Sequence, residues 1–185
     1  MAVIAPPRPS LFDRLALPPQ FRLLLWMFLV GLVVFQLGRL VFLVANADQV
    51  AGTSITTIAS AFLIGFRFDA IIALWILLPL LLFLPWIPLR LKTACWIVRS
   101  YVTLAFSLCV LLLLIDARFY DNLDTHLNFL AYEYFNQGNT FWHLVLSDPM
   151  FYPFILGWLA ATVGLWFCIG GLIRVCAKLH FEARW

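Results

Sequence analysis

Two charged residues, Arg67 and Asp69, interrupt a long apolar stretch and could bind a ligand or hold helices together. Ionisable groups at membrane depth are costly, so each is expected to pair or to reach water or headgroups. Residues two apart do not face each other on a regular helix, so we expect Asp69 to bind Arg39 and Arg67 to bind a lipid phosphate. Two interpretations stay open for this pair: a structural cap and interfacial anchor, or a lipid-headgroup site.

A second polar cluster follows the third apolar run, and it combines carboxylates with an arginine, a histidine and an amide. Its members are Asp116, Arg118, Asp121, Asp124, His126, Asn128 and Glu133. A metal site needs three or four converging ligands, but Asp121 and Asp124 form only an i, i+3 pair and His126 projects away from Asp124. We therefore interpret the cluster as a solvated face, with Arg118, Asp121, His126 and Asn128 as candidate external surface residues. We expect no metal ligand, no cofactor and no catalytic residue in this chain.

The composition places these clusters in a membrane protein. Soluble domains have roughly 45–50% apolar and about 25% charged residues, whereas this chain has 64% hydrophobic residues, 11% charged residues and a mean hydropathy of +0.99. A soluble core of this length could not hide so much apolar surface. We expect an all-α polytopic membrane protein with four transmembrane helices, over about 22–46, 70–87, 95–115 and 151–175.

Two interfacial amphipathic helices are expected beside the four spans. The apolar stretch over 53–88 would reach roughly 50 Å as one helix, against a hydrocarbon core of about 30 Å, so a break is expected at 65–69. Before the break, Ile55, Ile58 and Phe62 recur at helical spacing and predict a helix at the outer interface. After 115, the third helix is expected to continue as an amphipathic segment at the surface.

The distribution of charge predicts the orientation in the membrane. Basic residues gather in a proline-rich head over 1–21, in the middle loop and in a tail over 177–185, whereas the segments 47–69 and 116–150 carry the acids. Basic loops stay cytoplasmic, so both termini are expected inside and the two acidic segments outside. The small net charge of +3 lies mostly at one face and favours contact with anionic headgroups over nucleic-acid binding.

Several short motifs occur in a distinctive order around the spans. They are Gln-Leu-Gly-Arg-Leu-Val-Phe at 36–42, Gly-Phe-Arg-Phe-Asp at 65–69, Leu-Ile-Asp-Ala-Arg-Phe-Tyr at 114–120, His-Leu-Asn-Phe at 126–129 and Trp-His-Leu-Val-Leu-Ser-Asp-Pro at 142–149. Together they resemble the N-terminal membrane domain of the lipoteichoic acid synthase and phosphoglycerol transferase family, which is sulfatase-like and belongs to the alkaline phosphatase superfamily. The resemblance covers roughly residues 20–180.

The resemblance implies a larger enzyme than the present sequence contains. In members of the family, five transmembrane helices are typically followed by an external domain. That domain carries a threonine or serine nucleophile and a divalent metal such as manganese. In the synthases, that domain transfers glycerol phosphate from phosphatidylglycerol to a growing acceptor. This chain ends before a fifth helix and a catalytic domain, so it is expected to be either a fragment or a stand-alone relative. Arg39, Arg67 and Asp69 map onto the outer-leaflet polar cluster, and His126 and Asn128 onto the segment after the third span.

Our leading hypothesis is that the four-helix domain over 22–176 anchors such a transferase in the bacterial cytoplasmic membrane and contacts anionic phospholipid at the outer leaflet. The candidate headgroup residues are Arg39 and Arg67, which would contact phosphate, and Asp69, which would hold an arginine in place. Its expected partners are anionic phospholipids and a C-terminal catalytic domain or another membrane protein. The alternative is a non-catalytic four-helix subunit whose glycine-bearing fourth span packs against a partner. A small transporter is disfavoured, because intramembrane charges are few and no pair of discontinuous helices repeats in two halves.

Overall fold

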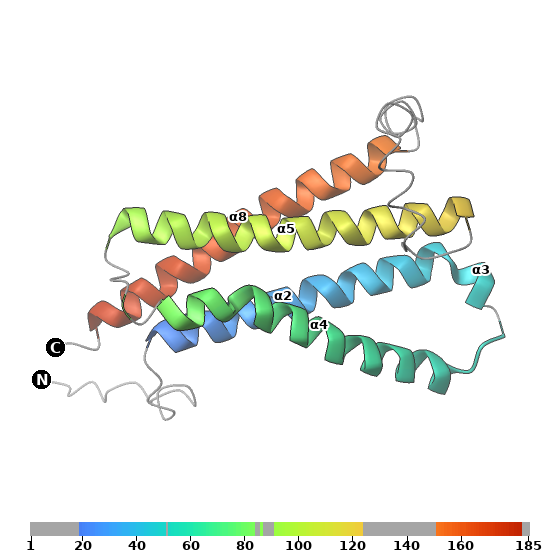
Figure 1. Cartoon of the computed structure of the whole chain (residues 1–185), viewed down its shortest axis with the longest axis horizontal. Coiled ribbons are helices and arrows are strands. Elements are labelled where there is room, and N and C mark those ends of the chain that lie inside the picture. Colours follow the sequence, from blue (N-terminus) through green and yellow to red (C-terminus); the bar gives the residue numbers. More distant parts are fainter. Residues whose placement is uncertain (1–18, 51, 84–85, 87–90, 124–150, 183–185) are drawn as a thin grey trace, which may run out of the picture.

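The computed structural model describes residues 19–50, 52–83, 86, 91–123 and 151–182, and its regular elements there are helices (Figure 1). Four of them are long: α2 (Pro19–Ala45), α4 (Ile55–Phe83), α5 (Lys92–Leu123) and α8 (Phe151–Glu182). The short helix α3 (Ala47–Val50) follows α2. Gly52 forms the turn toward α4 with a φ of 94°, a conformation that side chains with a Cβ rarely adopt.

Each long helix contains a segment that is long and apolar enough to cross a membrane. These segments are Gln20–Val44, Ile55–Phe83, Lys92–Ala117 and Tyr152–Ala177. Large apolar side chains cover the outside of the bundle, including Trp75 and Phe167, which are 68% and 69% exposed. A bundle in water would bury such side chains, whereas hydrocarbon solvates them. Over the described residues, the prediction of an all-helical fold with four helices long and apolar enough to span a membrane is confirmed.

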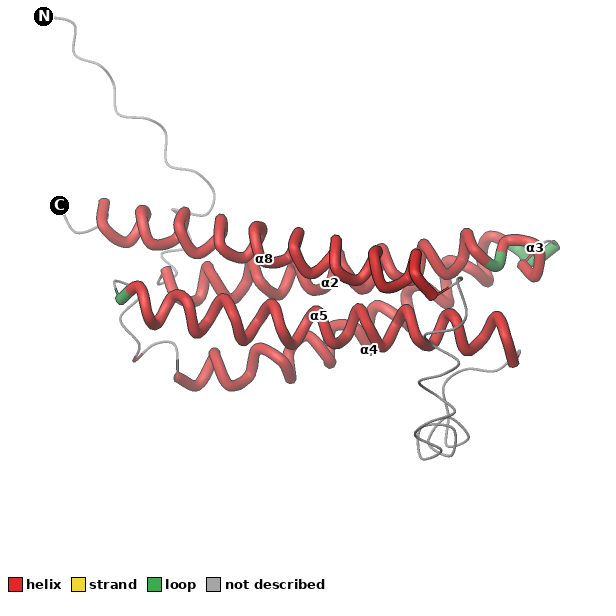
Figure 2. Tube along the Cα trace, turned by 90° about the horizontal axis from the view of Figure 1, so that it is seen from above, coloured by secondary structure: helices red, strands yellow, loops and turns green. Residues whose placement is uncertain are grey.

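The four long helices run alternately up and down and form two crossed pairs. Figures 1 and 2 show that the first described residues of α2 and the last of α8 lie at the same end of the bundle, opposite α3. We call these the Lys92 end and the α3 end. The arrangement agrees with termini on one side of the membrane, and the assignment of that side to the cytoplasm stays a prediction.

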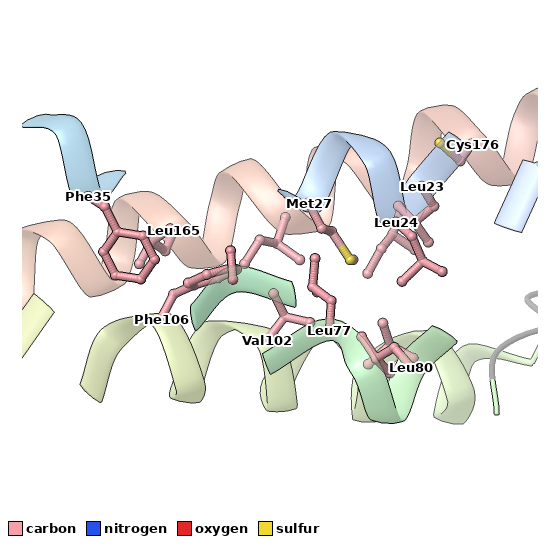
Figure 3. Packing of buried hydrophobic residues seen from close by; sticks show 14 residues of the cluster. Leu23, Leu24, Met27, Phe35, Leu77, Leu80, Val102, Phe106, Leu165 and Cys176 are labelled. Atoms are coloured by element: carbon pink, nitrogen blue, oxygen red, sulfur yellow. The ribbon is translucent and has the colours of Figure 1, made fainter. Parts of the chain in front are cut away.

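The core of the bundle is a stripe of apolar side chains contributed by all four long helices (Figure 3). Phe106 of α5 is fully buried and makes an edge-to-face contact with Phe35 of α2 at 6.0 Å between ring centroids. A Cβ built on Gly31 would lie 2.5 Å from the Phe106 ring, so the glycine allows the ring to pack against the backbone of α2. This contact fixes α2 against α5.

The predicted break at 65–69 is wrong, because α4 continues through these residues without interruption. Its 29 residues span about 43 Å, more than the hydrocarbon thickness of about 30 Å. Long helices tilt or project beyond the hydrocarbon, and the first turns of α4 carry Thr56, Thr57 and Ser60, which suit an interface. Ser54 caps the helix by accepting a hydrogen bond from the Thr57 amide at 3.2 Å.

The prediction that the third helix continues beyond 115 is confirmed as far as Leu123, where the described part of α5 ends. The rest of that expected surface segment, over 124–150, and the proline-rich head over 1–18 lie outside the described residues. The second span begins earlier than expected, at Ile55 instead of 70, because it includes the segment that was predicted to lie in the interface.

Candidate functional site

A partly buried ion pair joins α2 to α4 within the candidate membrane-spanning segments. Arg39 donates two hydrogen bonds to Asp69, from Nε to Oδ2 at 2.9 Å and from Nη2 to Oδ1 at 2.8 Å. Gln36 donates a third from Nε2 to Oδ2 at 3.0 Å. The side chain of Asp69 is 6% exposed and that of Arg39 is 36% exposed. The expected pairing of Asp69 with Arg39 is therefore confirmed, and we call Gln36, Arg39 and Asp69 the α2–α4 clamp.

Helical spacing explains why these residues meet. Gln36 and Arg39 are three apart on α2 and share a face, as do Gly65 and Asp69 four apart on α4. A Cβ at Gly65 would overlap the Arg39 guanidinium, so this glycine opens the space that the arginine occupies. The Arg39 Nη2 also lies 3.4 Å from the Gly65 carbonyl oxygen, which accepts a weaker hydrogen bond. The glycine of the Gly-Phe-Arg-Phe-Asp motif therefore makes room for the Arg39 side chain and does not interrupt the helix.

Arg67 lies on the opposite face of α4 from the clamp. It is two residues from both Gly65 and Asp69, which are buried, and its own side chain is exposed between exposed Phe66 and Phe68. Among the described residues, Arg67 has no hydrogen-bond or ion-pair partner. The structure thus brings together Arg39 and Asp69 but leaves Arg67 facing the surroundings of the bundle.

A cavity of about 280 Å³ lies beside the clamp, toward the α3 end. Arg39, Asn46 and Asp116 give it a polar side, and Phe42 and Phe62 are among the residues of its apolar side. Figure 1 shows how α2 and α4 diverge toward this end. The cavity therefore joins an apolar wall to a few polar groups, which is the combination that binding sites for amphiphilic molecules use.

The predicted external surface residues fall at or beyond the limit of the described chain. Arg118 and Asp121 belong to the last turns of α5, and His126 and Asn128 lie outside the described residues. Within the described part of the chain, no group of three or more histidine, cysteine, aspartate or glutamate side chains could hold a metal ion. The interpretation of 116–133 as a solvated face stays a prediction.

A polar cluster that was not predicted from the sequence joins α5 to α8. Ser107 and Thr162 share a hydrogen bond of 2.7 Å between their hydroxyls, and the Trp158 indole donates to the Ser107 hydroxyl at 2.9 Å. Thr103, one turn earlier on α5, has a buried hydroxyl with no hydrogen-bond partner among the described residues. The four-residue spacing of Trp158 and Thr162, matched by that of Thr103 and Ser107, is the sequence signal that could have revealed this seam.

Arg99 lies on the same α5 stripe, nearer the Lys92 end. Its Nε donates a hydrogen bond of 2.9 Å to the carbonyl oxygen of Trp166. Its guanidinium carbon lies 3.9 Å from the centroid of the Trp166 ring, a cation–π contact. Gly170 makes room for the guanidinium, since a Cβ there would lie 2.6 Å from the guanidinium carbon. Both intramembrane arginines of the bundle interior thus pack on a glycine of a neighbouring helix.

Comparison with protein-family models, curated proteins and solved structures finds no match for this chain.

Proposed function

We propose that this chain is the membrane domain of a lipoteichoic-acid-synthase-like transferase, which anchors the enzyme in a bacterial inner membrane and contacts anionic phospholipid at the outer leaflet. The catalytic chemistry and its divalent metal would belong to a separate external domain. The motif resemblance described above supports the family, and the positive-inside rule supports the orientation with the α3 end outside.

The observation that carries the lipid contact is Arg67. Its exposed guanidinium stands on the outward face of α4 among exposed apolar side chains, with no partner among the described residues. A charge in that position is stabilised when it reaches a lipid phosphate or water. With the orientation above, the nearest phosphates are those of the outer leaflet.

The α2–α4 clamp would support this contact rather than make it. Asp69 compensates the charge of Arg39, so Arg39 offers an anionic headgroup less attraction than Arg67 does. Its remaining role would be to fix α4 and line the cavity beside the clamp. Arg67 would then be the principal headgroup residue, and Arg39 and Asp69 the residues that position the helix that carries it.

Retention of phosphatidylglycerol by Arg67→Ala and Arg39→Ala tests the lipid contact. The full chain is purified with defined mixtures of phosphatidylglycerol and phosphatidylcholine, and the retained lipids are measured by mass spectrometry. We expect Arg67→Ala to lose phosphatidylglycerol selectively and Arg67→Lys to keep most of it, because lysine keeps the charge. Unchanged retention in both Arg67→Ala and Arg39→Ala would remove the headgroup role.

A second function is favoured by the glycines of α8. Gly157, Gly164 and Gly171 are exposed at seven-residue spacing, and a Cβ built on each meets nothing within 4 Å among the described residues. Small residues on an outward helix face permit close helix contact in membranes. This pattern supports the alternative of a non-catalytic subunit that packs against another membrane protein.

Enlarging one of these glycines tests the alternative. Gly164→Leu should abolish co-purification of a membrane partner while the chain itself stays folded, because a Cβ at this position meets nothing within 4 Å in the described part of the chain. Gly170→Leu is unsuitable as a control, since the Arg99 guanidinium packs against that glycine. Val163→Leu changes a neighbouring exposed residue but leaves Gly157, Gly164 and Gly171 without side chains, so this variant should keep the partner. Loss of the partner in both variants, or in neither, would contradict this function.

A further inference from the structure

The charges of the membrane-spanning segments do not balance at the Lys92 end. The spans contain two carboxylates, Asp69 and Asp116. Asp69 binds Arg39, and Asp116 lies 17 residues from Arg99 along α5, which corresponds to about 25 Å. Arg99 therefore has no carboxylate partner within the spans, although its position is inside the bundle.

The contacts of Arg99 hold its guanidinium without neutralising it. The Nε group donates to a neutral carbonyl oxygen, and the planar face stacks on the neutral Trp166 ring. The two terminal nitrogens, Nη1 and Nη2, have no hydrogen-bond partner among the described residues. An arginine fork with its Nε fixed and its terminal N–H groups available is suited to a phosphate oxygen.

Trp96 indicates the depth at which we expect Arg99 to lie in the membrane. Trp96, three residues earlier on α5, is 62% exposed, and exposed tryptophans of membrane helices gather at headgroup level. Three residues of helix correspond to a rise of about 4.5 Å, so we expect the backbone of Arg99 to lie about one turn below that level. On α8, the exposed Arg174 follows Gly170, on which Arg99 packs, by one helical turn toward the Lys92 end.

From these observations we propose that Arg99 and Arg174 form a binding site for a phosphate-bearing anion at the Lys92 end of the α5–α8 pair. The ligand is either the headgroup of an anionic phospholipid in that leaflet or free phosphate. Trp166 and Gly170 position the Arg99 guanidinium, Arg99 supplies a partly buried charge, and Arg174 supplies an exposed one. Arg67 lies near the middle of α4, on a different helix pair, so this site shares no residue with the proposed headgroup contact and is independent of the proposed function.

Thermal unfolding of the full chain in a neutral detergent tests the site. The midpoint is measured after addition of dioleoyl phosphatidylglycerol, dioleoyl phosphatidylcholine, or sodium phosphate against equal ionic strength of sodium chloride. We expect phosphatidylglycerol to raise the midpoint more than phosphatidylcholine does, and Arg99→Gln to bind phosphatidylglycerol about tenfold more weakly because a charge-assisted hydrogen bond is lost. Lys92→Gln removes an exposed cation at the same end and should keep the wild-type response.

Each arm of the experiment has a defined reading. A rise with phosphatidylglycerol alone that Arg99→Gln reduces supports a lipid site, and an equal rise with sodium phosphate supports a site for the free anion. An Arg99→Gln response equal to wild type, an equal loss in Lys92→Gln, or no rise with either phosphate source overturns the proposal. If Arg99→Gln does not fold, Arg174→Gln replaces it in the experiment, because Arg174 is exposed and its substitution leaves the bundle interior unchanged. A wild-type response of Arg174→Gln to phosphatidylglycerol also overturns the proposal.

Discussion

The α2–α4 clamp makes the sharpest prediction about stability. Asp69→Asn preserves the shape of the side chain but removes the negative charge that compensates Arg39. Loss of one partner of a buried ion pair costs about 3–5 kcal/mol, because the other charge stays uncompensated. Since the Arg39 side chain is 36% exposed, we expect a smaller loss of unfolding free energy, about 2–3 kcal/mol.

A double-mutant cycle separates the ion pair from the packing around it. Unfolding of the full chain is followed by circular dichroism during titration with sodium dodecyl sulfate in mixed micelles. In Arg39→Gln/Asp69→Asn neither charge stays buried alone, so the double variant should be more stable than the sum of the single changes predicts, by about 1–2 kcal/mol. Arg67→Gln, on the exposed face of the same helix, should change the unfolding free energy by about 0.5 kcal/mol or less.

Two results would refute this reasoning. If Asp69→Asn destabilises the chain no more than Arg67→Gln does, the carboxylate does not compensate a buried charge. If the two single changes are additive in the double variant, Arg39 and Asp69 are not energetically coupled, despite the hydrogen bonds of 2.8 and 2.9 Å between them.

Three further predictions follow from the packing and the orientation. Gly65→Ala should destabilise the chain because a methyl group would displace the arginine of the clamp, whereas Gly164→Ala should be close to neutral in the unfolding titration. Phe106→Ala should cost about 3–5 kcal/mol in the same titration, since it removes a fully buried ring from the core; a cost below that of Gly164→Ala would contradict the assigned core. In a cysteine-free background, Thr53→Cys should react with a membrane-impermeant maleimide in intact cells and Thr93→Cys only after lysis, and the reverse pattern would invert the orientation.

The sequence was sufficient to predict the four spans and the partner of Asp69. Hydropathy identifies the spans because crossing the hydrocarbon core requires a helix of about 20 mostly apolar residues, and an apolar run of that length is typical of a membrane span. The Arg39–Asp69 pair followed from the cost of leaving a charge unpaired at membrane depth and from the i, i+2 geometry that separates Asp69 from Arg67.

The continuity of α4 could not be predicted from length alone. A stretch longer than the hydrocarbon thickness is compatible with a break and also with a tilted or projecting helix. The choice depends on tertiary packing: Gly65 makes room for Arg39, and Asp69 receives three hydrogen bonds, so the Asp69 carboxylate is satisfied within a continuous helix. The roles of Arg99 and Ser107 were missed for a related reason, because their partners on α8 are more than 50 residues away in the chain.

Lipid cross-linking next to Arg67 tests the central claim most directly. A photoreactive residue in place of Leu63, which is 68% exposed and lies one turn from Arg67 on the same face, would sample the lipids around that arginine in vesicles of phosphatidylglycerol and phosphatidylcholine. The proposed headgroup contact predicts that phosphatidylglycerol is cross-linked above its mole fraction and that Arg67→Gln, but not Arg67→Lys, removes the excess. Cross-linked lipids that match the bulk composition, or an excess that survives Arg67→Gln, would contradict it.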